Sequence, residues 1–293
     1  MLNLLIKVVL LFPLRTCYLA FRFYDSVLSS IFPQLRGVGR QQLIDYIDND
    51  IKLTNHGSTS FQLYTPNRMC NFRHQTFSTK EPEMIEWIEE YGGGVFFDIG
   101  ANIGIYSLYY AQAKEGNIYS FEPSVFNLRQ LAKNISVNEL SERITIVSNP
   151  LSETTGTAKF INGSADEGGA MSAFGVEYGY NGEPIISDIT YSVLGFSLDD
   201  LFEKNMLTEI PSLIKIDVDG IEHLILKGAT KTLKSEKVKS LFIEVNDDFK
   251  EQAHQVKNIL ESAGFVLKEK RNSEMLARSE LFGRTYNQIW VRT

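Results

Sequence analysis

One stretch, VFFDIGANIGIYS at residues 95–107, constrains the fold more than any other. A short apolar run ends at Asp98, a turn of small residues follows, and apolar residues with helical spacing resume at Ile105. This order predicts a strand, a tight turn and a helix. Glycines let such a turn bend sharply and approach a ligand, and the free N–H groups at the start of a helix can face that ligand. The stretch is therefore typical of a nucleotide-binding turn.

The spacing of the glycines differs from the dinucleotide fingerprint G-x-G-x-x-G. Gly100, Asn102 and Gly104 form G-x-N-x-G, with Asp98 two residues before the first glycine. This pattern resembles motif I of class I S-adenosylmethionine (SAM) dependent methyltransferases. Glu122 follows Gly104 by 18 residues and closes a second apolar run, where an acid can accept both ribose hydroxyls of an adenosine. An isolated turn of this kind would be an ordinary strand–helix loop, but the two acids favour a ligand site.

Beyond this turn, strand patterns alternate with helical patterns, which predicts a mostly parallel, doubly wound sheet. Ligands of such sheets bind at the carboxyl ends of the strands. That rule places five polar side chains around one crevice: Asp98, Glu122, Asn149, Asp217 and Glu244. A long glycine-rich segment, residues 162–183, has no apolar period, and we expect it to be a loop that faces the substrate.

The charge balance bears on the class of substrate. The chain has 29 basic and 36 acidic residues, a net charge of −7, and no block of basic residues. Binding a phosphate backbone needs a cationic surface, so the balance argues against DNA or RNA as a partner. The two cysteines, Cys17 and Cys70, form neither a disulfide framework nor a zinc site, which favours reduced thiols in a cytoplasmic protein.

The N-terminus allows three interpretations. Residues 1–14 are nearly all apolar, but the run is too short and too interrupted for a transmembrane span. It could form a helix that caps the core, or a helix at a membrane surface whose Lys7, Arg15 and Arg22 meet anionic headgroups. A secretion signal is the third interpretation, with a weak match to the expected pattern. We expect any peripheral membrane contact to lie within residues 1–30.

Four separated segments resemble the FkbM-type methyltransferase family. They are DIGANIGIYS (98–107), FEPSVFNLRQLAKN (121–134), SLDD (197–200) and KIDVDGIEHLILKGA (215–229). The resemblance implies a Rossmann-like α/β fold, in which a seven-stranded, mostly parallel sheet has helices on both faces and an antiparallel last strand. It also implies SAM as methyl donor and hydroxyls of sugars or natural products as acceptors. We expect an α-rich accessory region over residues 1–78 and the methyltransferase domain over residues 79–293.

The motif and the resemblance together predict the cofactor-binding residues. They are Asp98, Gly100, Asn102, Gly104, Glu122 and Asn149. The turn residues are expected to hold the methionine end of SAM, and Glu122 its ribose. Asn149 lies in a segment, residues 148–150, where the family commonly has a more alanine-like sequence.

Methyl transfer from a sulfonium is an in-line displacement that depends on positioning, and a hydroxyl acceptor benefits from a general base or a bound Mg²⁺. We expect Asp217 and Glu244 to face the acceptor. His223 is a further candidate base, although it could equally be a surface histidine. Asn246 could join Asp217 and Glu244 as an oxygen ligand of Mg²⁺, whereas Asp217 could instead bond loop amides.

The sequence therefore predicts a SAM-dependent O-methyltransferase that acts on a hydroxyl of a sugar, glycan or natural product. Its expected partner is a small-molecule or glycan acceptor and no nucleic acid, and its expected location is the cytoplasm, with membrane association left open. The alternatives are an NAD-linked oxidoreductase and a non-catalytic module with a SAM-binding fold. A base N-methyltransferase is less favoured, because Asp217-Val218-Asp219-Gly220 replaces the proline-rich aromatic motif of those enzymes.

Overall fold

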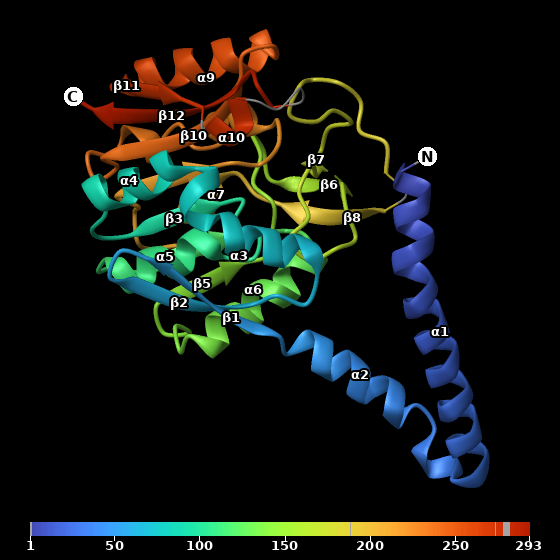
Figure 1. The fold of residues 1–293 in the computed structure, drawn as a ribbon. Coiled ribbons are helices and arrows are strands. Elements are labelled where there is room, and N and C mark those ends of the chain that lie inside the picture. The colour runs from blue at the N-terminus through green and yellow to red at the C-terminus, as the bar shows by residue number, and fades with distance from the viewer. Residues whose placement is uncertain (1, 188, 273, 278–281) are drawn as a thin grey trace. The chain divides into compact units, whose positions relative to one another are not determined.

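The computed structural model describes residues 2–187, 189–272, 274–277 and 282–293 of the 293-residue chain. By packing, the chain divides into two units, Met1–Asp50 and Ile51–Thr293 (Figure 1).

The first unit is helical, and its side chains from residue 12 onward form no apolar core. It contains α1 (Leu2–Ile31), the 3-10 turn η1 (Pro33–Leu35) and α2 (Val38–Asp48). From residue 12 to residue 50, the only buried side chain is that of Asp25, whose Oδ2 lies 4.0 Å from Nη2 of Arg40. Within the part of the chain that the structure describes, no helix combines the length and apolarity needed to cross a membrane.

The second unit is built on a seven-stranded sheet with the strand order β11-β12-β10-β9-β3-β4-β5 (Figure 1). The strands are β3 (Phe96–Ile99), β4 (Ile118–Phe121), β5 (Ile144–Val147), β9 (Leu213–Ile216), β10 (Ser240–Asn246), β11 (Phe265–Arg271) and β12 (Thr285–Arg292). The five strands from β10 to β5 pair in parallel, and β12 runs antiparallel to both of its neighbours. This confirms the predicted sheet and its antiparallel last strand.

Helices cover both faces of this sheet. They are α4 (Pro82–Tyr91), α5 (Ile105–Ala113), α6 (Val125–Val137), α7 (Leu198–Glu203), α8 (Glu222–Lys227) and α9 (Lys250–Ser262), with the short elements η2 (Thr232–Lys234) and α10 (Glu274–Ala277). Side chains of α4, α5 and α6 fill one apolar cluster, and those of α7, α8 and α9 fill the other. Successive strand residues point to opposite faces, so Phe96 joins the first cluster and Phe97 the second.

A hairpin and a helix from the predicted accessory region belong to the second unit. They are β1 (Ile51–His56), β2 (Thr59–Tyr64) and α3 (Arg68–Lys80). Alternate residues of β2, Phe61 and Leu63, join the cluster that α5 helps to form, because the outward side of the strand is polar and the inner side apolar. By packing, the division of the chain therefore falls at Asp50/Ile51, earlier than the boundary at residues 78/79 suggested by the sequence.

A small antiparallel sheet accompanies the main one. It has the order β7-β6-β8 and consists of β6 (Gly156–Ile161), β7 (Ala173–Phe174) and β8 (Thr190–Gly195). The glycine-rich segment predicted as a loop connects β6 to β8 and forms the short β7 on its way. This sheet therefore fixes both ends of the loop.

Asn134 of α6 joins the hairpin to the turn before α5. Its Oδ1 accepts a hydrogen bond from Tyr64 N (2.9 Å) and its Nδ2 donates one to Ile103 O (2.8 Å), and the side chain is fully buried. We expect Asn134→Ala to lower the free energy of unfolding by about 2–3 kcal/mol, since both backbone groups would lose their partner in the interior. Urea denaturation measures this change.

Asn138→Ala is the matched control. Asn138 also bonds the hairpin, through Gln62 N and Gln62 O (2.8 Å each), but at a more exposed position where water can replace it. An equal loss of unfolding free energy in the two variants would contradict the interpretation that the buried hydrogen bonds of Asn134 hold the hairpin.

Candidate functional site

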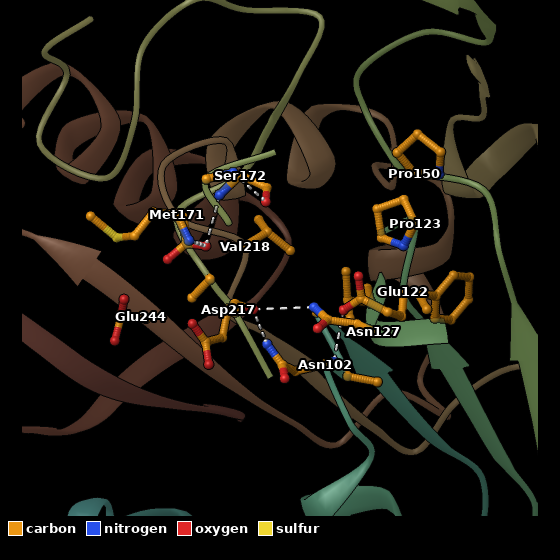
Figure 2. A pocket seen from close by; sticks show the side chains of 18 of the residues that line it. Asn102, Glu122, Pro123, Asn127, Pro150, Met171, Ser172, Asp217, Val218 and Glu244 are labelled. Atoms are coloured by element: carbon orange, nitrogen blue, oxygen red, sulfur yellow. Dashed lines mark hydrogen bonds between the residues drawn. The ribbon is translucent and has the colours of Figure 1, made fainter. Parts of the chain in front are cut away.

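A pocket of about 470 Å³ opens at the carboxyl ends of the central strands (Figure 2). Its walls come from the ends of β3, β4, β9 and β10, from the glycine-rich loop and from α3. This is the edge at which doubly wound sheets bind ligands, and the volume lies within the range of small-molecule sites.

The turn after β3 forms one wall of the pocket. Gly100, Asn102 and Gly104 all have positive φ, at 84°, 54° and 85°. A Cβ at Gly100 would lie 1.9 Å from Asp217 O, and one at Gly104 would lie 2.4 Å from a methyl of Leu131. Both positions therefore require glycine, for backbone conformation and for space. Gly100 and Asn102 line the pocket, whereas Gly104 lies behind it as the N-cap of α5.

Glu122 follows β4 and faces the pocket beside this turn. Its Oε2 accepts a hydrogen bond from Asn102 N and its Oε1 one from Ser124 N, both at 2.8 Å. Burial raises the pKa of Glu122 to about 7, and these amide hydrogen bonds oppose the rise. Each carboxylate oxygen has a second lone pair, so the oriented group can still accept hydrogen bonds from a ligand.

Asp98 acts from behind the pocket. Its side chain is fully buried, and its Oδ2 accepts a hydrogen bond from Ser107 Oγ (2.6 Å). Its Oδ1 lies 3.1 Å from Nζ of Lys215, which also donates to Gly100 O (3.0 Å) and lies 3.5 Å from Asp217 Oδ2. Burial alone would lower the pKa of Lys215, but the carboxylates of Asp98 and Asp217 raise it above its ordinary value. Lys215 therefore links the buried carboxylate of Asp98 to Gly100 and Asp217, two residues that line the pocket.

The opposite side of the pocket is rich in carboxylates. Glu81, Asp217, Asp219 and Glu244 all line it (Figure 2 labels Asp217 and Glu244). Glu81 accepts hydrogen bonds from Lys80 Nζ (2.8 Å) and Tyr106 OH (2.5 Å). Burial would raise the pKa of Glu81, but these partners, Lys80 above all, lower it.

Glu244 differs from Glu81 because no cation pairs with it directly among the salt bridges described. Burial, followed by the negative charges of Asp217 and Glu81, raises the pKa of Glu244 well above its usual range. A carboxylate in such surroundings binds a proton more strongly than an exposed glutamate does.

His223 does not line the pocket. Ile221 and Ile225, four residues apart, place one face of α8 against the pocket, so His223 projects from another face. Its buried ring packs edge-on against Phe249 at 6.0 Å between centroids, and burial lowers its pKa. The structure therefore places His223, the predicted alternative base, outside the pocket lining.

Asn246 also lies outside the pocket lining. Its Oδ1 accepts a hydrogen bond from Asp248 N (2.9 Å), and its backbone N donates to Gln252 Oε1 (3.3 Å), so it builds the turn between β10 and α9. The predicted Mg²⁺ ligands Asp217 and Glu244 therefore lack their third member. Among the residues that the structure describes, no group of three or more His, Cys, Asp or Glu side chains could hold a metal ion. The predicted Mg²⁺ site does not fit this geometry.

Asn149 lines the pocket, as expected of a cofactor contact. Its Nδ2 donates to Leu194 O (2.8 Å), so its amide group is tied to β8. Of the six predicted cofactor residues, the structure thus brings four to the pocket surface, namely Gly100, Asn102, Glu122 and Asn149.

The glycine-rich loop closes over the pocket through two sets of hydrogen bonds (Figure 2). Gly169 O accepts from Asn102 Nδ2 (2.6 Å) and from Asn127 Nδ2 (3.2 Å). Asp219 Oδ2 accepts from Met171 N (2.6 Å) and, at 3.4 Å, from Ser172 N. Asp219 has a φ of 61° and Met171 one of 67°, so both residues adopt left-handed conformations at this contact. The loop faces the pocket, in agreement with the prediction.

Sequence reasoning missed the contribution of α3. Met69, Phe72 and Arg73 line the pocket from this helix, and Lys80 follows at its end. Arg73 Nε also donates to Gly168 O (2.8 Å), which joins the helix to the loop. Their spacing places them on neighbouring turns of one helical side, but nothing local to the sequence shows that this side faces the strand ends.

Residues 98–267 match the family model of the Methyltransferase FkbM domain. Among proteins with curated functions, none matches this chain in sequence.

The solved structures that are similar to this chain include three of low sequence identity. The methyltransferase FkbM from Methylobacillus flagellatus KT is 18% identical with a TM-score of 0.45, over 67% of this chain and 42% of that one, so this chain spans less than half of that relative. A precorrin-6y C5,15-methyltransferase from Geobacter metallireducens GS-15 is 12% identical with a TM-score of 0.44, over 72% and 87%. A fibrillarin from Aeropyrum pernix, solved with natively bound S-adenosyl-L-methionine, is 11% identical with a TM-score of 0.40, over 67% and 65%.

The contact of Asp219 with the loop predicts a local opening when its carboxylate is removed. In Asp219→Ala, Met171 N loses its acceptor, and we expect amide hydrogen exchange in residues 169–172 to accelerate about tenfold or more. Hydrogen-exchange mass spectrometry measures this rate, with Asp219→Asn as the control that keeps an acceptor oxygen. Equal protection in the wild type and in Asp219→Ala would show that the loop is held elsewhere.

Proposed function

The chain belongs to the FkbM methyltransferase family, and we propose that it transfers a methyl group from SAM to a hydroxyl of a small-molecule or glycan acceptor. The observation that carries this proposal is a single pocket with two unlike sides. In Figure 2, Glu122 and Pro123 lie on one side, Glu244 lies on the other and Asp217 lies between them. A donor site beside an acceptor site is what group transfer requires.

We assign the donor to the side formed by the turn after β3. Gly100 and Asn102 would bind the methionine end, Glu122 the ribose hydroxyls, and Asn149 would contact the adenine. Two features support the fit: a backbone at Gly100 that leaves no room for a Cβ, and a carboxylate at Glu122 oriented by two amides. When bound, SAM supplies a methyl group activated by its positively charged sulfur.

Asp98 and Gly104 have supporting roles in this assignment. Asp98 holds Lys215, which binds Gly100 O, and Gly104 begins α5 in a conformation that a side chain would strain. The G-x-N-x-G spacing and the family match support SAM rather than NAD as the ligand of the turn.

We assign the acceptor to the carboxylate-rich side, with Glu244 as the general base. A hydroxyl oxygen becomes a better nucleophile when its proton moves to a nearby carboxylate. Burial and the charges of Asp217 and Glu81 raise the pKa of Glu244, so its carboxylate attracts a proton more strongly than an ordinary glutamate does. Asp217 is paired with Lys215 and would instead position the acceptor. The proposal assigns no role to a metal ion.

We further propose a cytoplasmic location, where SAM is available, and an acceptor other than nucleic acid. The net charge of −7 supports this choice, since a phosphate backbone would be repelled by an acidic protein with a carboxylate-rich pocket.

The ribose assignment predicts a loss of SAM affinity in Glu122→Ala. Removing hydrogen bonds to a charged group costs about 1.5–3 kcal/mol, so we expect the dissociation constant to rise about 10- to 100-fold. Isothermal titration calorimetry of the purified chain with SAM measures it. Glu142→Ala, on the exposed loop before β5, is the control. An unchanged SAM affinity in Glu122→Ala would refute the assignment, and binding of NAD in place of SAM would refute the proposed donor.

The catalytic assignment predicts different effects for two candidate bases. Tritium transfer from methyl-labelled SAM to a panel of glycosides and phenols would first identify an acceptor. With that acceptor, we expect Glu244→Gln to lower kcat about 10²- to 10⁴-fold, because the general base is lost, while SAM affinity is kept. His223→Gln should retain the wild-type rate, since His223 lies outside the pocket lining. A large loss in His223→Gln and none in Glu244→Gln would reverse the assignment.

A further inference from the structure

The first unit exposes an unusual amount of apolar surface. In α1, the side chains of Phe12 and Phe23 are 71% and 73% exposed, and those of Leu19 and Val27 are also exposed. These residues are spaced by seven, four and four, which places them on one face of the helix. From residue 12 to residue 50, no side chain of this unit covers this face, because these side chains form no core.

Aromatic side chains are concentrated at the same place. Residues 12–32 contain Phe12, Tyr18, Phe21, Phe23, Tyr24 and Phe32. Five of these are exposed, and only Phe21 is half-buried. Aromatic residues are favoured at the boundary between lipid headgroups and acyl chains, where one end of the ring can stay hydrated.

The charge of this part of the chain is opposite to that of the rest. Residues 1–40 contain five basic residues and one acidic residue, a net charge of +4, whereas residues 41–293 carry −11. The basic residues are Lys7, Arg15, Arg22, Arg36 and Arg40, and the acidic one is Asp25. Arg15 and Arg22 are exposed and seven residues apart, so they flank the apolar face on one side of α1.

From these observations we infer that α1 binds the surface of an anionic lipid bilayer, with the face of Phe12, Leu19, Phe23 and Val27 among the acyl chains. A helix of 30 residues, with an apolar face beside exposed arginines, has the character of helices that lie in the membrane interface. Charge complementarity selects this occupant. A second copy of the chain would bring two cationic helices together, whereas anionic headgroups neutralise them.

This inference is independent of the methyl-transfer proposal, so its test measures membrane binding and no activity. Full-length protein is floated with vesicles of phosphatidylcholine alone, or with about 30% phosphatidylserine added. We expect flotation with the anionic vesicles and little with the neutral ones. Phe12→Ser/Phe23→Ser should weaken binding at least about tenfold through lost apolar burial. Arg15→Gln/Arg22→Gln should weaken it about 30-fold, and added salt should act in the same direction.

Ile186→Ser is the matched control, because Ile186 is 97% exposed but belongs to the second unit. It should float like the wild type, and thermal unfolding should be unchanged in all variants. Absent flotation, equal flotation with neutral vesicles, or wild-type flotation of the phenylalanine variant would overturn the inference. A dimer in light scattering without lipid that Phe12→Ser/Phe23→Ser dissociates would also overturn it, by assigning the face to a second copy.

Discussion

The buried ammonium of Lys215 connects the parts on which the site depends. It lies opposite Asp98 in the parallel pairing of β9 with β3, and it contacts Asp98 Oδ1, Gly100 O and Asp217 Oδ2. A charge with 2% of its surface exposed is tolerated only where anions and carbonyls surround it, and removing one partner of such a pair commonly costs about 3–5 kcal/mol. The contacts of Lys215 therefore hold both the turn after β3, through Gly100 O, and the carboxylate of Asp217 after β9.

The pocket has sides with different chemistry. Near the turn, amides orient Glu122, which makes that carboxylate a fixed acceptor of hydrogen bonds. Farther along, Lys80 and Tyr106 stabilise the charged form of Glu81. Burial, followed by the like charges of Asp217 and Glu81, raises the pKa of Glu244. The same residue type therefore meets three different environments in one pocket: Glu122 is oriented by amides, Glu81 is paired with Lys80, and Glu244 is buried among like charges.

The pocket is closed by segments that are distant in the chain. The loop between β6 and β8 bonds Asn102 in the motif turn, Asp219 in the turn after β9, and Arg73 in α3. Asn134 in turn fixes the hairpin that leads to α3. The pocket therefore depends on residues 51–80 as well as on the strands, and these residues belong to the second unit.

The sequence by itself determined the elements with a local physical cause. The G-x-N-x-G turn could be predicted because its backbone conformation needs glycine at two positions, and the sheet because strand and helix periods are local patterns. Tertiary structure decided which side chains share the pocket. Packing turned His223 toward Phe249, used Asn246 in a turn, placed Asp98 behind Lys215 and brought α3 to the strand ends. Spacing along the chain fixes which residues share a face of one element, but only contacts between distant elements decide what that face meets.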